Sequence, residues 1–162
     1  MKKESYREFA ALFLITFMFS CQNKHKVQQT PFPEWVNAAR SNCEEYEVAL
    51  NDIQKSEIFN RNKTNLTKAV VQNTIGELDN ISTNQGGSEA NITITVNYQN
   101  KTVTFLGDVT DNLDVYAAVA NMSKGQCVQF SATGIRANSF FERSKVCDNN
   151  YEVDFTQITN CQ

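Results

Sequence analysis

The chain has 162 residues, with 15 lysines and arginines against 18 aspartates and glutamates, and a net charge of −3. Nucleic-acid binding needs a basic face, so this slight acidic excess argues against DNA or RNA as the partner. The length suits one domain of ordinary size with its own hydrophobic core, once an N-terminal leader is set aside.

Residues 1–20 have the pattern of a secretory signal peptide. Lys2, Lys3 and Arg7 precede an apolar run over residues 9–19 that only Thr16 interrupts. A run of this length matches the apolar region of a signal peptide. It is too short to cross a hydrocarbon core about 30 Å thick as a helix. We therefore expect residues 1–20 to be absent from the mature fold.

The end of this leader resembles the lipobox of bacterial lipoproteins. In Met18-Phe19-Ser20-Cys21, an apolar residue at −3 and a small residue at −1 precede a cysteine. The resemblance implies that Cys21 becomes the lipidated N-terminus, carrying palmitate, and that the protein is anchored to the membrane of the cell envelope. Gln22 stands where aspartate usually retains an enterobacterial lipoprotein at the inner membrane. We therefore expect the outer membrane, with the domain facing the periplasm or the cell surface.

The alternative to lipidation is an ordinary signal peptide cut near Ser20, which would leave Cys21 as a spare thiol. In either case residues 21–33 are predicted to form a flexible tether, because they are polar and end in Pro31-Phe32-Pro33. The folded domain is then predicted to span residues 34–162.

A single helix is predicted at the start of the domain, from Glu34 to about Phe59. Its apolar stripe recurs at spacings of three and four, and we expect this stripe to face the core: Trp35, Ala39, Cys43, Tyr46, Leu50 and Ile53. Trp35 is interpreted as a core residue in this stripe rather than as a ligand-stacking residue.

The remainder is predicted to be mainly strand, because apolar and polar residues alternate. Gly76, inside the first strand, indicates a bulge or a bend, and residues 111–122 are predicted as a short helix or an irregular crossover. The strands are expected at residues 71–81, 92–98, 103–106, 127–131 and 140–146, with a short terminal strand at 151–155.

This order is that of a five-stranded OB-fold barrel, preceded by one helix and followed by a short C-terminal strand. Residues 45–158 also resemble uncharacterised bacterial OB-fold-type proteins, although Ile75 and Ala132 replace a tryptophan and a glycine of those proteins. The matching landmarks are Gly76 and the segments 46–56, 124–131 and 142–144. The resemblance implies a fold and no activity.

Four cysteines remain after Cys21, and an even number in an exported chain predicts two disulfides: Cys43, Cys127, Cys147 and Cys161. We expect Cys127 to pair with Cys147 across neighbouring strands and Cys43 to pair with Cys161. The rival pairing is Cys147–Cys161. The chain has no Cys-x-x-Cys, so we expect neither a metal site nor a redox centre.

We expect no catalytic activity and no cofactor. The only histidine, His25, lies in the tether, and no Gly-x-Ser-x-Gly or phosphate-binding glycine loop occurs. Three aspartates are spaced three residues apart: Asp108, Asp111 and Asp114. An EF-hand loop needs a glutamate at its twelfth position, but a loop that began at Asp108 or at Asp111 would have an apolar residue there. A solvated acidic loop is the interpretation we adopt.

We therefore predict an interaction module that binds an envelope protein or a small ligand. OB-fold barrels usually bind on the face of strands 2 and 3 and the loops beside it, and the candidate contact residues are Tyr98, Tyr116, Phe140 and Phe141. The alternative is an envelope inhibitor or immunity-type protein directed against a hydrolase or a toxin.

Overall fold

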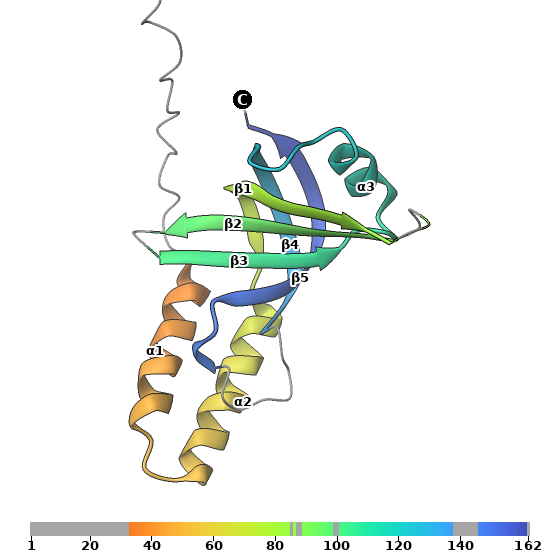
Figure 1. Ribbon diagram of the computed structural model, residues 1–162. Helices are drawn as coiled ribbons and strands as arrows, with labels where there is room; N and C mark the ends of the chain where they lie inside the picture. Colours follow the sequence, from red (N-terminus) through yellow and green to blue (C-terminus); the bar gives the residue numbers. More distant parts are fainter. Residues whose placement is uncertain (1–32, 85, 87–88, 99–100, 138–145, 162) are drawn as a thin grey trace, which may run out of the picture.

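The elements follow one another in the order α1, α2, β1, β2, β3, α3, β4 and β5 (Figure 1). The structure is a computed structural model that describes residues 33–84, 86, 89–98, 101–137 and 146–161. The predicted signal peptide and the lipidation site Cys21 lie outside these residues. No helix of the described part is both long and apolar enough to cross a membrane.

The N-terminal region is a helical hairpin, so the prediction of one helix over residues 34–59 is wrong. Helix α1 covers Glu34–Val48 and helix α2 covers Asp52–Lys68. Ala49 and Asn51 both adopt extended backbone conformations, which end the first helix and start the second. The Asn51 side chain accepts hydrogen bonds from the N–H groups of Ile53 at 3.1 Å and Gln54 at 3.0 Å. Such an N-cap satisfies backbone donors that a helix start leaves free.

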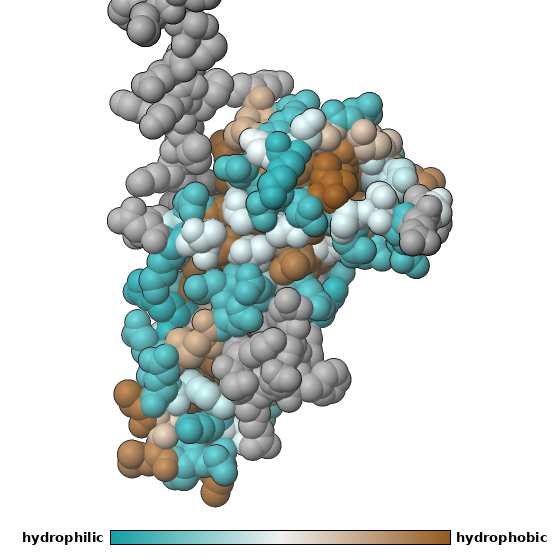
Figure 2. Space-filling model, viewed as in Figure 1, coloured by the Kyte–Doolittle hydropathy of each residue, from teal (hydrophilic) through white to brown (hydrophobic). Residues whose placement is uncertain are grey.

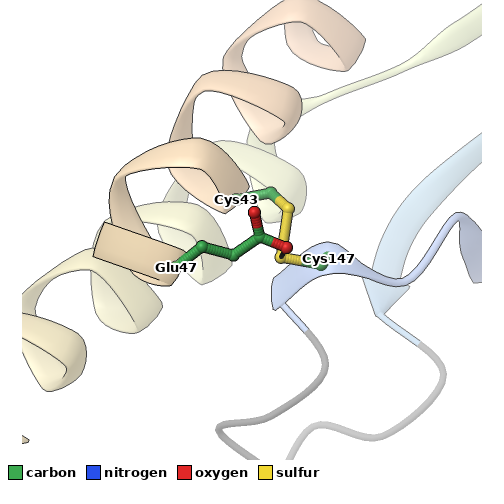
Figure 3. Close-up of side chains that lie close together, drawn as sticks. All are labelled: Cys43, Glu47 and Cys147. Carbon is green, nitrogen blue, oxygen red and sulfur yellow. Dashed lines mark hydrogen bonds between the residues drawn. A yellow bond between two sulfur atoms is a disulfide. The ribbon is translucent and has the colours of Figure 1, made fainter. Parts of the chain in front are cut away.

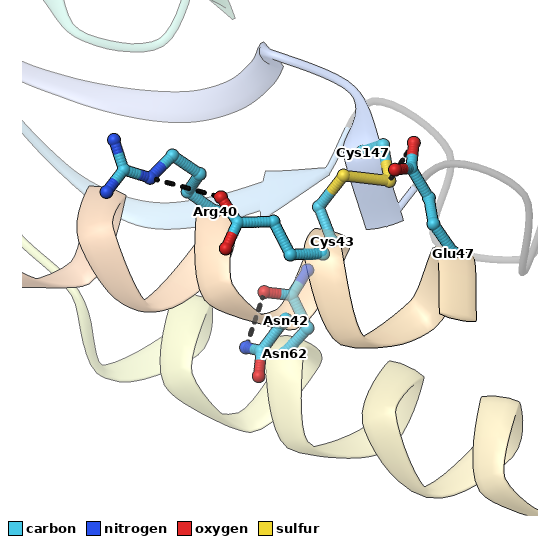
Figure 4. The surroundings of a disulfide bond; sticks show 7 residues. Arg40, Asn42, Cys43, Glu47, Asn62 and Cys147 are labelled. Carbon is cyan, nitrogen blue, oxygen red and sulfur yellow. Dashed lines mark hydrogen bonds and ion pairs between the residues drawn. A yellow bond between two sulfur atoms is a disulfide. The ribbon is translucent and has the colours of Figure 1, made fainter. Parts of the chain in front are cut away.

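The two helices of the hairpin contact each other through polar side chains. Asn42 and Asn62 are both buried, and Asn42 Nδ2 donates to Asn62 Oδ1 at 3.1 Å (Figure 4). Arg61 Nε donates to Asn42 Oδ1 at 2.9 Å, and the same guanidinium forms an ion pair with Glu45. Buried amides are costly unless paired, so this network fixes how the two helices align.

A closed five-stranded barrel forms the rest of the domain, and the prediction of a small barrel is confirmed. The neighbours run in the order β1-β2-β3-β5-β4, antiparallel except for the parallel pair β3 and β5. The strands are β1 (Val71–Thr83), β2 (Ala90–Tyr98), β3 (Lys101–Asp108), β4 (Cys127–Ala137) and β5 (Asn150–Asn160). Helix α3 (Leu113–Val119) joins β3 to β4 at the predicted crossover and brings the helices to three rather than one.

The last strand belongs to the barrel and is not an added C-terminal strand. Strand β5 is the antiparallel partner of β4 and takes the place in the barrel of the fifth strand that the sequence predicts at residues 140–146. Of that segment only Val146 is described, and it lies in a 3₁₀ turn with Cys147. Strand β5 holds this place because its apolar side chains are buried in the core: Tyr151, Val153, Phe155 and Ile158.

Aromatic rings fill the barrel, and one ring comes from α1. The rings of Phe105 and Phe130 lie 5.3 Å apart, and Phe130 lies 5.7 Å from Phe155. Trp35 stands edge-on to Tyr151 at 5.2 Å and to Phe105 at 6.2 Å. Trp35 therefore packs against the core, as expected, and attaches the start of the hairpin to the barrel.

Two glycines allow strands to approach closely. A Cβ on Gly76 would lie 2.7 Å from Ile94 Cγ2, and β1 shifts register on both sides of this glycine. A Cβ on Gly107 would lie 2.5 Å from the Val153 carbonyl oxygen. Both positions exclude larger side chains because backbone or core atoms already occupy the space.

Candidate functional site

The four predicted cysteines form two disulfides, as expected, but the predicted pairing is wrong. The bonds join Cys43 to Cys147 and Cys127 to Cys161. Strand β5 lies beside β4 with Val128 opposite Asn160, so Cys127 faces the C-terminal end of the chain. The Cys161 N–H accordingly donates to the Cys127 carbonyl oxygen at 3.2 Å.

The Cys43–Cys147 disulfide attaches α1 to the segment that precedes β5. The two Cα atoms lie 4.8 Å apart, and the bond closes a chain separation of 104 residues. Cross-links over long separations remove much conformational freedom from the unfolded chain. This bond therefore holds the hairpin to the barrel at a point well along α1.

Of the four predicted contact residues, one is wrong and two lie outside the described residues. Tyr98 is fully buried, because it shares the inward side of β2 with Ile94 and Val96. Burial raises the pKa of Tyr98 to about 12, while a hydrogen bond with the Thr74 side chain opposes the rise. Tyr116 is half-buried on α3 and packs against the core. Phe140 and Phe141 are the two outside the described part.

The outer face of β2 and β3 carries mainly short polar side chains, together with the partly exposed Leu106. Thr95 pairs with Thr104, and Asn97 pairs with Thr102, whose hydroxyl donates to the Asn97 Oδ1 at 2.8 Å. Protein interfaces are enriched in aromatic residues, methionine and arginine. None of these occurs among the outward residues of β2 and β3 that the structure describes.

A small pocket lies between α1, β3 and the segment before β5. Its volume is about 80 Å³, and its lining includes Arg40, Lys101, Asp148 and Tyr151. Burial, with the Asp148 charge second, raises the pKa of Tyr151 to about 12. Pockets for small ligands usually measure about 300–1,000 Å³. This one has room for water molecules and offers no site for a larger ligand.

Beside this pocket, Cys43, Glu47 and Cys147 bring three potential metal ligands within 4.8 Å of one another (Figure 3). Glu47 Oε1 lies 3.9 Å from Cys147 Sγ. Cysteine binds metals as a thiolate, whereas here both sulfurs are joined in a disulfide. The oxidised protein therefore has no metal site at this position.

The acidic loop after β3 has the character expected of a solvated turn. The Asp108 carboxylate accepts a hydrogen bond from the Thr110 N–H at 2.8 Å and another from the Thr110 hydroxyl. Both hydrogen bonds lower the pKa of Asp108, and the bond from the hydroxyl has the larger effect. In the described part of the chain, Asp108, Asp111 and Asp114 do not converge as potential metal ligands.

Exposed apolar side chains gather at the far end of the hairpin. Val48 is 75% exposed, Leu50 90% and Ile53 73%. We name these three residues the hairpin tip, and Figure 2 shows brown side chains at this end of the molecule. The prediction that Leu50 and Ile53 face the core is wrong, because the turn at residues 49–51 ends the apolar stripe of α1.

The backbone of this turn is held by local hydrogen bonds. The Leu50 N–H donates to Gln54 Oε1 at 2.9 Å, and the Asn51 side chain caps α2. The pattern Asn51-x-x-Gln54 is a capping-box sequence, a local signal from which the break could have been found. The hairpin tip is thus presented on an ordered turn.

Charge is divided unequally along the hairpin. Residues 44–57, around the turn, hold five acidic side chains and one lysine, a net charge of −4. Residues 34–43 and 58–68, nearer the barrel, hold one acidic and four basic side chains, a net charge of +3. Exposed ion pairs join Arg40 to Glu44 and Arg61 to Glu45, and such pairs are weak. The part of the hairpin next to the hairpin tip is therefore acidic, and we call its five carboxylates the acidic rim: Glu44, Glu45, Glu47, Asp52 and Glu57.

Comparisons of the chain with models of known protein families, with curated proteins and with solved structures each gave no match. The interpretation of the hairpin tip consequently rests on the geometry of this chain alone.

Proposed function

We propose that this protein is a lipid-anchored, non-catalytic interaction module of the bacterial cell envelope. The observation that carries the proposal is the hairpin tip, where three large aliphatic side chains lie exposed on an ordered turn. Exposed apolar groups that gather on a polar-rimmed projection are typical of interaction sites. The domain binds its partner through the hairpin, and the barrel is the body that holds the hairpin in place.

The barrel is of the OB-fold type. The neighbour order β1-β2-β3-β5-β4, with a helix between β3 and β4, supports this assignment. In this family of folds the face of β2 and β3 often binds ligands. Here that face has mainly short polar side chains around a partly exposed Leu106, whereas the hairpin tip exposes three large aliphatic side chains, so we assign the contact to the hairpin instead.

The anchor is the lipidated Cys21, and Gln22 after it favours the outer membrane. The lipobox-like sequence supports this assignment, and the disulfides suit an oxidising compartment outside the cytoplasm. In cells given labelled palmitate, wild-type protein should carry the label and partition into detergent. Cys21→Ser should lose both properties because no thiol remains to be lipidated. Equal labelling of the two proteins would contradict the proposal.

Affinity capture from envelope extract tests the interaction itself. The full chain is compared with Leu50→Asp, and with Leu113→Asp as a control on α3, where Leu113 is 77% exposed. The wild type and the control should recover a common partner that Leu50→Asp loses. Identical recoveries from all three would contradict a partner at the hairpin. A hydrolase recovered in equal amount and inhibited by this protein would favour the inhibitor alternative.

A further inference from the structure

We infer that the hairpin tip docks into an apolar pocket with a rim of lysine and arginine side chains on another envelope protein. This inference rests on the proposed function, because it names the chemistry of the partner at the same site.

The shape of the hairpin favours insertion into a pocket. Leu50, the most exposed of the three apolar residues, lies in the turn, with Val48 and Ile53 on either side along the chain. Two packed helices end here, each about 10 Å across, so the projection is narrow. The hairpin extends away from the barrel, which leaves its end accessible (Figure 1). A narrow apolar end buries more of its surface in a concavity than on a flat surface.

The ordered turn reduces the entropy lost on binding. In the unbound protein, the Gln54 side chain already accepts a hydrogen bond from the Leu50 N–H, and the Asn51 side chain caps the first turn of α2. Binding is tighter when the contacting segment already has its bound conformation. Most of the free energy gained by burying the exposed aliphatic side chains can therefore contribute to affinity.

The charge around the hairpin tip specifies the rim of the partner. Glu44 and Glu45 pair with arginines of the hairpin itself. Asp52 and Glu57 are exposed and have no ion pair with any residue that the structure describes. Complementary charge around an apolar contact steers association and rejects wrong partners. A basic rim on the partner matches this acidic rim.

The same charges disfavour two other possible binding partners of the hairpin tip, a lipid membrane and a second copy of this chain. Anionic lipid surfaces attract basic segments and repel acidic ones. A second copy of the chain would place one acidic rim against another, which disfavours a symmetric contact.

Photo-crosslinking in intact cells tests the inference with the full lipidated chain. A benzoylphenylalanine replaces Leu50, and in a control chain it replaces Leu113, which is similarly exposed but on α3. The first chain should form an adduct with one other protein at a yield at least about ten-fold above the control. The crosslinked peptide of that protein should lie in an apolar site with lysines or arginines around it.

Charge reversal in the Leu50 crosslinking chain tests the rim. The double change Asp52→Lys and Glu57→Lys should lower the adduct yield at least about ten-fold. The matched control is Glu89→Lys with Asp111→Lys, which makes the same change of charge at exposed positions outside the hairpin. This control should leave the yield unchanged. An equal yield from the rim variant would overturn the basic-rim inference.

Vesicles test the membrane alternative. Leu50→Trp and the control Leu113→Trp are compared as lipidated proteins in vesicles of phosphatidylcholine or phosphatidylglycerol with brominated acyl chains. The two should show equal quenching. Stronger quenching of Leu50→Trp would place the hairpin tip in the bilayer and overturn the inference.

The remaining outcomes separate the two proposals. An adduct between two copies of the chain would assign the hairpin tip to self-association and overturn the inference. An adduct from position 113 alone would also overturn the inference, but the proposal that the protein is an interaction module would still stand. If neither position gave an adduct and affinity capture recovered no partner, both the proposed function and the inference about the hairpin tip would be contradicted.

Discussion

The barrel interior is almost entirely apolar, whereas the hairpin buries polar as well as apolar side chains and exposes apolar ones at its tip. Inside the barrel, Leu78, Ile94 and Phe105 are completely buried. The hairpin instead buries Asn42 and Asn62 between its helices and exposes Leu50 at its end. Sequences usually satisfy every local rule except where function requires otherwise. The contrast teaches that the barrel serves stability, whereas the hairpin carries an exposed surface that folding alone does not require.

The two regions also differ in what holds them in place. The barrel strands pair around a complete circle, so each strand has two hydrogen-bonded neighbours. The hairpin is attached through Trp35 and Cys43 of α1 and through Leu66 of α2, which is buried in the same core as the barrel side chains. Among the changes proposed below, loss of the Cys43–Cys147 disulfide should therefore have the largest effect on stability.

Replacing this bond with Cys43→Ser/Cys147→Ser should lower the free energy of unfolding by about 4.7 kcal/mol, the chain-entropy value for a loop of about 100 residues. Hydrogen exchange should increase mainly in α1 and α2. The control Cys127→Ser/Cys161→Ser opens a separation of only 34 residues, so it should cost less and affect the ends of β4 and β5. Equal exchange throughout the domain in the first variant would show that the bond does not act on the hairpin selectively.

Two identical truncations compare the inside of the barrel with the hairpin tip. Leu78→Ala removes a side chain with no exposure and should cost about 3 kcal/mol of stability, because it leaves a cavity. Leu50→Ala removes a side chain that is 90% exposed and should change stability by less than about 0.5 kcal/mol. Urea denaturation measures both changes. A large loss from Leu50→Ala would mean that this residue is needed for folding.

High pH should destabilise the barrel before it affects the hairpin tip. The folded-state pKa values of Tyr98 and Tyr151 are raised to about 12, above the usual value of 10.0. The unfolded chain releases these protons first, so stability is retained below pH 10 and lost as the pH rises toward 12. Each tyrosine accounts for about 3 kcal/mol over this interval. Thermal unfolding of Tyr98→Phe against pH should show a shallower loss than wild type.

If the wild type and Tyr98→Phe lose stability equally between pH 10 and pH 12, burial of Tyr98 does not disfavour its ionised form. The pH range below 10 provides the internal reference, because both tyrosines are protonated there in the folded and the unfolded chain.

The smallest effect should come from the cap at the turn. Asn51→Ala removes the two hydrogen bonds that start α2 and should cost about 1 kcal/mol. Asn60→Ala, at an exposed position within the same helix, should be neutral or slightly stabilising because alanine is the better helix former. Circular dichroism during thermal unfolding compares the two. Equal melting temperatures would show that the cap contributes nothing measurable.

Part of the helical hairpin was accessible from the sequence and was missed. The spacing from Tyr46 to Leu50 and Ile53 continues a helical stripe, so periodicity alone predicts one long helix. Asn51 and Gln54 indicate a new helix start in the same place, and the structure follows this capping signal. Periodicity does not distinguish a continuous helix from two helices that a short turn interrupts.

The local features of this protein can be read from its sequence. Alternation located β2 and the start of β4, Gly76 indicated the tight part of β1, and the four cysteines indicated two disulfides. These features depend on residues that are near one another in the chain or on simple counts. The alternation of β2 also directed Tyr98 inward, so its assignment as a contact residue disregarded a signal that was already present.

Contacts between residues far apart in the chain depend on how the whole domain folds. Cys127 lies near Cys161 because β5, rather than residues 140–146, pairs with β4, and Cys147 is then left beside α1 within reach of Cys43. The exposure of Leu50 depends in the same way on the direction in which the hairpin leaves the barrel. Strand pairing and helix direction depend on packing across the whole domain, and a local pattern carries no information about them.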